Sequence, residues 1–178
     1  MKPYTISQGD GIYFCTDTII SFAYVFVEIE LFEIIIDSLK YCQKEKGLQL
    51  LAYVIMPNHV HTIMGANNGD LSDILRDYKQ YTSRKITETF RLRGNAQILS
   101  LFKSAAKHAG KGNQYKVWQS GSHPQLMDYD EKLFQKIEYI HNNPVRKGFV
   151  EALECWTYSS ARNYITNDDS IIAIQKLW

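Results

Sequence analysis

The chain has 178 residues, of which 45% are hydrophobic and 22% are charged, and its formal net charge is +1. These values exclude a mainly disordered chain and predict one domain over residues 1–178. Three cysteines without a Cys-x-x-Cys pair exclude a disulfide scaffold and argue against a cysteine zinc site. Because the chain shows neither the layout of a signal peptide nor an apolar stretch long enough to span a bilayer, we expect a cytoplasmic protein with no membrane partner.

The first predicted elements are a strand and a helix. Residues 11–18 are rich in aromatic and β-branched side chains, which favours a strand. The apolar run 19–27 fits either an extension of that strand or the start of a helix. Apolar residues then recur at helical spacing from 29 to 46, and Gly47 stands where a helix stops. We therefore predict a helix over 29–46.

A β-hairpin and a second helix are predicted next. The nearly continuous apolar run 48–56 indicates a buried strand, Pro57-Asn58 has the composition of a turn, and 59–64 indicates the returning strand. Asp70 then stands where it can cap a helix. The apolar stripe of that helix consists of Leu71, Ile74, Leu75, Tyr78 and Thr82.

The second half of the chain adds two helices and a strand. Residues 96–108 indicate a helix, and residues 117–127 indicate strand and loop. Residues 131–142 indicate another helix, which we expect Pro144 to end because proline disfavours helical geometry in the residue before it. This order of elements predicts an α+β fold of the ferredoxin-like class, in which helices pack on an antiparallel sheet.

Charge is unevenly distributed along the chain. Residues 76–116 contain ten Lys or Arg and two acidic residues, a net charge of +8, so the remainder carries −7. Aromatic residues such as Tyr78 and Tyr81 are interleaved with the basic ones. Basic groups neutralise phosphates and aromatic rings stack on unpaired bases, which points to nucleic acid. The alternative is a solvated helix face whose apolar side lies in the core.

Two histidines share one face of the predicted strand 59–64. Residues two apart on a strand point the same way, so His59 and His61 lie side by side while Val60 faces the other layer. Neutral imidazole is a common ligand of divalent metals, although two ligands alone do not complete a site. The alternative is a pair of partly buried histidines that hydrogen-bond to backbone or water.

Tyr139 lies off the apolar stripe of its predicted helix. At about 100° per residue, it falls on the polar side of the helix, and Asn143 follows one turn later on the same side if the helix persists that far. The phenol and the amide oxygen would then approach the same point. The alternative is a tyrosine that packs against a second neighbouring element.

These patterns resemble a known family over roughly residues 10–165. The run Leu51-Ala-Tyr-Val-Ile-Met-Pro-Asn-His-Val-His61 resembles the metal-binding strand of the HUH single-tyrosine transposases. The run Tyr139-Ile-His-Asn-Asn-Pro-Val-Arg-Lys-Gly-Phe-Val150 resembles the tyrosine helix of their REP-associated tyrosine transposase branch. Trp118-Gln119 and the run 156–161 are similar to the same branch.

The resemblance implies a ferredoxin-like sheet of the HUH endonuclease type and a catalytic site. It implies His59 and His61 as metal ligands, Tyr139 as the nucleophile and Asn143 as a further ligand. The implied metal is Mg²⁺ or Mn²⁺. The implied activity is nicking and strand transfer of single-stranded DNA, at hairpins, through a 5′-phosphotyrosine intermediate.

We therefore expect single-stranded or hairpin DNA as the partner. The predicted DNA contacts are Arg76, Lys79, Arg84, Lys85, Arg91 and Arg93. A homodimer is left open, since relatives of this kind include both dimers and monomers. Two other functions are also open: a catalytically inactive DNA-binding regulator derived from a transposase, and a metal-dependent hydrolase that uses water and leaves Tyr139 without a role.

Overall fold

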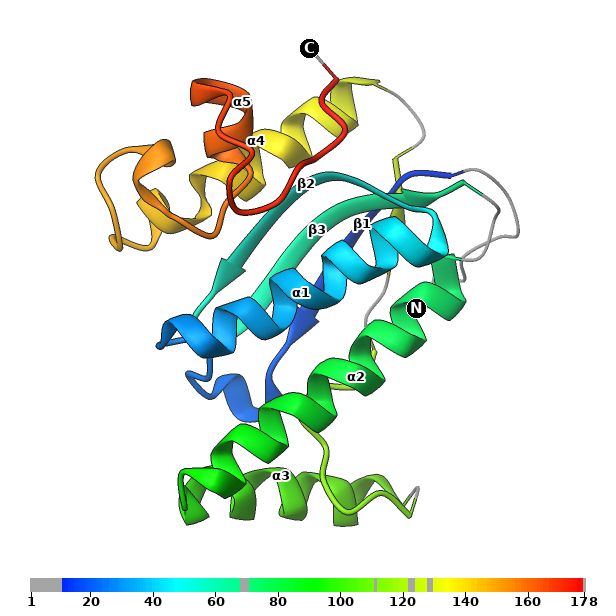
Figure 1. Ribbon diagram of the computed structural model, residues 1–178, viewed down its shortest axis with the longest axis vertical. Helices are drawn as coiled ribbons and strands as arrows, with labels where there is room; N and C mark the ends of the chain where they lie inside the picture. Colours follow the sequence, from blue (N-terminus) through cyan, green and yellow to red (C-terminus); the bar gives the residue numbers. More distant parts are fainter. Residues whose placement is uncertain (1–10, 68–70, 111, 122–123, 128–129, 178) are drawn as a thin grey trace.

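The computed structural model describes residues 11–67, 71–110, 112–121, 124–127 and 130–177. The strands are β1 Tyr13–Thr18, β2 Leu48–Met56, β3 His59–Ala66 and β4 Gln125–Leu126. They form one antiparallel sheet in the order β2-β3-β1-β4 (Figure 1). This order, with helices packed on the sheet, confirms the predicted ferredoxin-like α+β fold.

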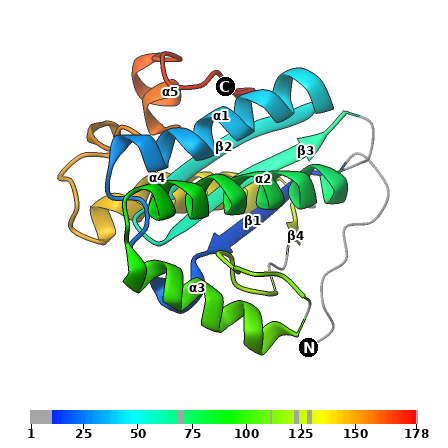
Figure 2. The same cartoon turned by 60° about the horizontal axis from the view of Figure 1, so that its bottom comes forward.

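Helices lie on both faces of this sheet. Their bounds are α1 Ile29–Lys46, α2 Leu71–Leu92, α3 Ala96–Ala109, α4 Asp130–Arg146 and α5 Ala161–Thr166, with 3-10 turns η1 Ile20–Phe22 and η2 Leu153–Cys155. α1 and α2 cover one face, α4 lies on the other, and α3 extends from the end of α2 toward η1 (Figures 1 and 2). No helix within the described ranges is long and apolar enough to cross a membrane.

The alternation of side chains along β3 decides what each helical layer meets. Val60 and Met64 belong to the core beneath α1 and α2, whereas Ile63 belongs to the smaller core beneath α4. His59 lies four positions and His61 two positions before Ile63 on the strand, so all three side chains point to the same face of the sheet. Both histidines therefore point toward α4, as the predicted strand required, and away from α2.

Most of the predicted elements are confirmed. The helix over 29–46 has the predicted bounds, and Gly47 ends it with a φ of 69°, a left-handed conformation that glycine adopts readily. Of the segment 117–127, the pair Gln125–Leu126 forms β4, and Trp118 forms a bridge with the residue after β1. The predicted cap Asp70 lies outside the described residues.

The run 19–27 forms neither of the predicted elements. It consists of the short turn η1 followed by extended chain, because its backbone forms hydrogen bonds with the Pro57-Asn58 turn. The carbonyl of Asn58 accepts a hydrogen bond from Ile19 (2.9 Å), and that of Pro57 accepts one from Val25 (2.8 Å). These bonds wrap the run around the end of the hairpin, next to His59.

α4 continues through Pro144, so the predicted end of this helix is wrong. The proline lies two residues before the end of the helix, where it removes only one backbone hydrogen bond. Asn143 and Pro144 are buried, and their carbonyls accept hydrogen bonds from Lys147 (3.1 Å) and Phe149 (3.0 Å). Asn143 therefore stays on the helix, one turn after Tyr139.

Candidate active site

His59 and His61 lie side by side between the sheet and α4. Their ring centroids are 4.6 Å apart, and the ring of His61 stacks on Phe14 of β1 at 5.3 Å. Only 6% of the surface of His61 is exposed. The pair is held in place by the register of β1 with β3, which sets Thr18 opposite His59 and Thr16 opposite His61.

Hydrogen bonds orient both imidazoles. The amide of Asn58 donates through Nδ2 to the carbonyl of Phe22 (3.3 Å), and its Oδ1 accepts from Nδ1 of His59 (2.6 Å). The proton of His59 is therefore on Nδ1 and its lone pair is on Nε2. Nδ1 of His61 is occupied by the hydroxyl of Thr16 at 2.8 Å. Nε2 is then the nitrogen that remains available in both rings. In metal sites, the other ring nitrogen of a histidine ligand is likewise held by a hydrogen bond.

Burial keeps the two imidazoles neutral. It lowers the pKa of His59 to about 4, with a smaller contribution from the charge of Lys147. It lowers the pKa of His61 to about 3, with smaller contributions from His59 and Lys136. A neutral imidazole has the lone pair that a metal ion requires.

These shifts predict that the metal-free protein loses stability in mild acid. Burial also lowers the pKa of His141 to about 4. Between about pH 6.5 and these lowered values, the unfolded chain binds protons that the folded chain does not. The contribution of these neutral imidazoles to the free energy of unfolding is therefore fully present above about pH 6.5. Below that pH, we expect the free energy of unfolding to decrease by up to about 1.4 kcal/mol per pH unit for each imidazole.

Denaturant unfolding between about pH 7 and pH 4.5, with a chelator present, measures this dependence. His141→Gln should make the free energy of unfolding depend less steeply on pH, because Gln does not titrate. The control is the surface substitution His108→Gln, which removes no buried imidazole. A free energy of unfolding that stays constant down to pH 4.5 would contradict the prediction.

Tyr139 reaches the histidine pair from α4. Its ring centroid lies 5.4 Å from that of His61 and 6.1 Å from that of Phe14. The side chain is 37% exposed, as expected for a residue off the apolar stripe. Its hydroxyl forms no hydrogen bond with any residue that the structure describes. The phenol therefore stands beside the neutral imidazole of His61, and its side chain is partly open to solvent.

Two cations beside Tyr139 were not identified from the sequence. Lys136 Nζ lies 5.4 Å and Arg146 Cζ lies 5.8 Å from the centre of the Tyr139 ring. They stand three residues before and seven residues after Tyr139, a spacing that shares a helix face and could have identified them. Asn58 and Thr16 were also missed: Asn58 adjoins His59 in sequence, whereas Thr16 is found only from the strand register.

Asn143 shares the side of α4 that carries Tyr139. It lies one turn after Tyr139 and one turn before Lys147, whose charge acts on His59. Asn143 is buried, and its Oδ1 has no hydrogen-bond partner among the described residues. An unpaired buried acceptor costs about 1–3 kcal/mol, so this oxygen is a candidate to accept a bond from a ligand or a water molecule.

The donor atoms in this layer fit a divalent metal. Within the described ranges, no group of three or more His, Cys, Asp or Glu residues could hold a metal ion. A metal site in this layer would therefore need an amide oxygen beside the two imidazoles, and the atoms of these kinds are Nε2 of His59, Nε2 of His61 and Oδ1 of Asn143. Imidazole nitrogen and amide oxygen are both ligands of divalent ions, and the unpaired Oδ1 is the observation that supports this set.

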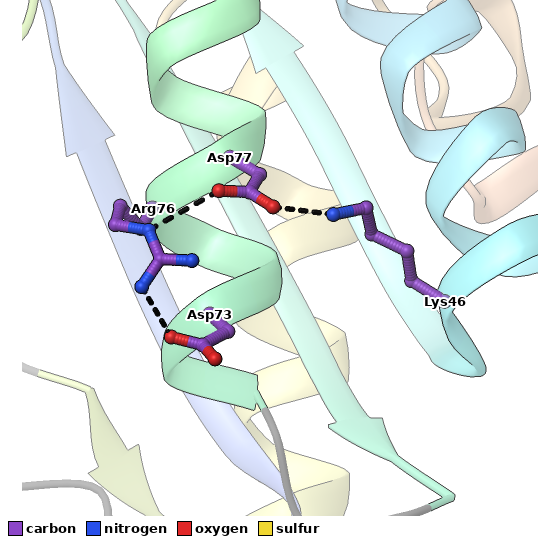
Figure 3. A network of polar contacts seen from close by, with 4 residues as sticks. All are labelled: Lys46, Asp73, Arg76 and Asp77. Carbon is purple, nitrogen blue, oxygen red and sulfur yellow. Dashed lines mark hydrogen bonds and ion pairs between the residues drawn. The ribbon is translucent and has the colours of Figure 1, made fainter.

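Four of the six predicted DNA contacts form ion pairs within the chain. Figure 3 shows Arg76 between Asp73 and Asp77, with Lys46 on the other carboxylate oxygen of Asp77. The remaining pairs are Lys79 with Asp17 (2.6 Å), Lys85 with Glu88 (3.3 Å), and Arg93 with Glu28 (2.8 Å) and Glu30. Arg84 and Arg91 instead lie over the rings of Tyr81 and Tyr115, each at 5.8 Å. Because most of these residues belong to α2, across the sheet from α4, the structure does not bring them to Tyr139.

Sequence comparison identifies the family of this chain. The family described as Transposase IS200 like matches residues 25–143, a range that contains both histidines, Tyr139 and Asn143. The chain belongs to this transposase family. The family resemblance inferred from the two sequence runs is thereby confirmed. His123, which the family match also covers, lies outside the described residues.

Two relatives of this transposase-family chain are informative. A Haemophilus influenzae protein named as a REP-associated tyrosine transposase is 27% identical over 112 residues, which cover 63% of this chain and 58% of that protein. The chain thus matches less than two thirds of the length of this relative. A structure of a REP-associated tyrosine transposase bound to a REP hairpin matches with a TM-score of 0.66 and 16% identity, covering 100% of this chain and 94% of that one. At this identity the match shows a shared fold.

Proposed function

We propose that this chain nicks and rejoins single-stranded DNA through a covalent bond between Tyr139 and a 5′ phosphate. One juxtaposition carries the proposal: the partly exposed phenol of Tyr139 stands beside the neutral imidazole of His61, which is paired with His59, and the next turn of the same helix carries the unpaired buried amide oxygen of Asn143. Lys136 and Arg146 add positive charge next to the phenol, where a phosphate would lie. Membership of a transposase family supports DNA as the substrate.

The proposed step is a transesterification at phosphorus. Oη of Tyr139 attacks the phosphodiester, the Oη–P bond forms and the P–O3′ bond breaks. The phenol loses its proton and the departing 3′ oxygen gains one, so the products are a 5′-phosphotyrosine and a free 3′-hydroxyl. Because the new ester keeps the energy of the broken one, the 3′-hydroxyl of another strand can reverse the step, and no nucleotide cofactor is required.

Mg²⁺ or Mn²⁺ would be held by His59, His61 and Asn143. When bound, such an ion offsets the negative charge that develops on the phosphate oxygens. The fold favours binding of such an ion in two ways. It keeps both imidazoles neutral, and it fixes their Nδ1 atoms through hydrogen bonds with Asn58 and Thr16.

Asn143→Leu should separate stability from metal binding. Leucine has a similar size and removes the unpaired oxygen from the interior, so we expect the metal-free variant to be about 1 kcal/mol more stable. We also expect Mn²⁺ to raise the unfolding temperature of the unmodified chain, and this rise should disappear in the variant. Calorimetry with and without Mn²⁺ measures both effects, and Asn142→Leu is the neighbouring control. A less stable variant that still responds to Mn²⁺ would contradict this role.

The proposed DNA surface extends from α2 onto α3. The sequence contains no acidic residue between Glu88 and Asp128, a stretch with six Lys or Arg. Lys103 and Lys107 of α3 are exposed, and α3 contacts η1, which adjoins the end of the sheet that carries the histidines. A hairpin stem bound along α3 would therefore place its unpaired foot near Tyr139. The REP hairpin bound by the fold relative supports this class of DNA.

Binding of hairpin DNA should weaken steeply with salt. Each neutralised phosphate releases counterions, so about four contacts predict a loss of roughly 100-fold in affinity between about 50 and 200 mM salt. Lys103→Glu with Lys107→Glu should lower this slope. Lys44→Glu is the control, because Lys44 lies on α1 with 82% of its side chain exposed. A flat salt dependence, or equal affinity for random duplex, would count against this surface.

A denaturing gel separates the proposed function from its alternatives. Incubation with labelled hairpin DNA and Mn²⁺ should give a protein band that retains the label after denaturation. A catalytically inactive regulator would bind the hairpin without cutting it. A hydrolase that uses water would cut the hairpin and leave no label on the protein.

A further inference from the structure

A cavity of about 200 Å³ lies beside His59 and is not used by the proposed transesterification. Its lining comes from the 19–27 run, the hairpin turn and the segment after α4, and includes Phe22, Tyr24, Pro57, His59, Lys147 and Phe149. The described lining contains no acidic residue. The cavity therefore combines aromatic rings with positive charge, and it opens next to a proposed metal ligand.

The aromatic rings of this cavity are unusually exposed. Phe22 is 63%, Tyr24 is 61% and Phe149 is 42% exposed. Phe149 is supported from behind by Trp156, at a ring distance of 5.5 Å, so its position is defined although one side is open. Three open rings around one cavity are better explained by a planar ligand than by the core.

The backbone of Phe22 gives independent support. Its φ of 54° lies in the left-handed region, which is an outlier for a bulky residue, and its ring gains little burial in return. The carbonyl of Phe22 is tied to Nδ2 of Asn58, whose Oδ1 holds His59. Strain of this kind persists where a ligand site requires it. Asn58 thus links the backbone of Phe22 to His59.

We propose that this cavity holds an unpaired base adjoining the phosphate that Tyr139 attacks. The proposal rests on the function proposed above and names the part of the substrate that the cavity would select. Base faces stack on aromatic rings, and Lys147 supplies the charge for the adjacent phosphate. His59 lines the cavity and is also one of the proposed metal ligands. One DNA strand can therefore occupy the cavity and the catalytic site at the same time.

The test compares two hairpins, both bound by the full chain carrying Tyr139→Phe so that no DNA is cleaved. One hairpin has an unpaired extension at its foot, and the other has the same extension without bases. The ratio of their dissociation constants measures the contribution of the bases. We expect a ratio of about 5- to 150-fold, the range of one stacking contact.

Phe22→Gly and Tyr24→Ala should bring this ratio close to one. Glycine accepts the left-handed conformation at position 22, so this variant removes the ring without destabilising the fold. Tyr41→Ala is the matched control, because Tyr41 on α1 is 58% exposed, and it should keep the full ratio. Sedimentation of each variant reports whether the cavity instead mediates self-association.

An unchanged ratio in both cavity variants would overturn this proposal, as would a ratio of one in the Tyr139→Phe parent. Conversion of a dimer to a monomer by the cavity substitutions would assign the rings to a protein interface and would also overturn it. Each of these results leaves the proposed nicking function intact. Failure to bind either hairpin would overturn both proposals together.

Discussion

Replacing Tyr139 by phenylalanine should abolish the covalent protein–DNA product completely. The substitution removes only the hydroxyl, and the ring keeps its contacts with His61 and Phe14. Because the side chain is 37% exposed, we expect the free energy of unfolding to change by less than about 0.5 kcal/mol. Hairpin affinity and the response to Mn²⁺ should also be retained. Denaturing gels with labelled hairpin DNA measure the product.

Tyr81→Phe is the matched control for this experiment. Tyr81 is 38% exposed and lies in the basic helix α2, so it combines equal accessibility with a position in the predicted DNA surface. Its variant should form the covalent product at the unmodified rate. Undiminished product from Tyr139→Phe would mean that the nucleophile lies elsewhere.

His61→Ala should remove metal-dependent cleavage. Loss of groups that merely support metal ligands already costs about 10- to 100-fold in affinity or activity, so loss of a ligand should cost at least about 100-fold. Hairpin binding should be largely retained, because the imidazole is buried beneath Tyr139 and carries no charge. Titration with Mn²⁺ and single-turnover cleavage measure the two losses separately.

His141→Ala controls for the damage of emptying a buried histidine site. His141 and His61 are each 6% exposed, but His141 bonds Ser160 through Nε2 and is not part of the pair. This variant should lose stability to a similar extent and still cleave DNA. Full cleavage by a folded double variant, His59→Ala with His61→Ala, would contradict the assignment of the metal site.

The central geometry of the site was predictable because it depends on local periodicity. Two histidines two residues apart on a strand must share a face, whatever the rest of the fold. The stripe that carries Tyr139 and Asn143 follows from the pitch of one helix. Pro144 departs from this prediction, because a proline near the end of a helix removes only one backbone hydrogen bond and does not end the helix.

The remaining features depend on contacts between distant segments, which periodicity does not encode. Thr16 reaches His61 only through the register of β1 with β3. Lys79 is predicted as a DNA contact from its place in the basic segment, whereas its ion pair with the buried carboxylate of Asp17, at 2.6 Å, follows only from tertiary folding. The exposure of the Phe22 ring likewise cannot be predicted from the sequence, because the apolar composition of the run 19–27 is typical of a buried segment.

Mapping the covalent bond to a residue tests the central claim most directly. The unmodified chain is trapped on hairpin DNA with Mn²⁺, digested with protease and nuclease, and its nucleotide-bearing peptide is sequenced by mass spectrometry. The chain has 12 tyrosines, so the assignment is selective. We predict a nucleotide attached through its 5′ phosphate to Tyr139 and to no other residue. Attachment to Tyr81 or to any other side chain would contradict the account.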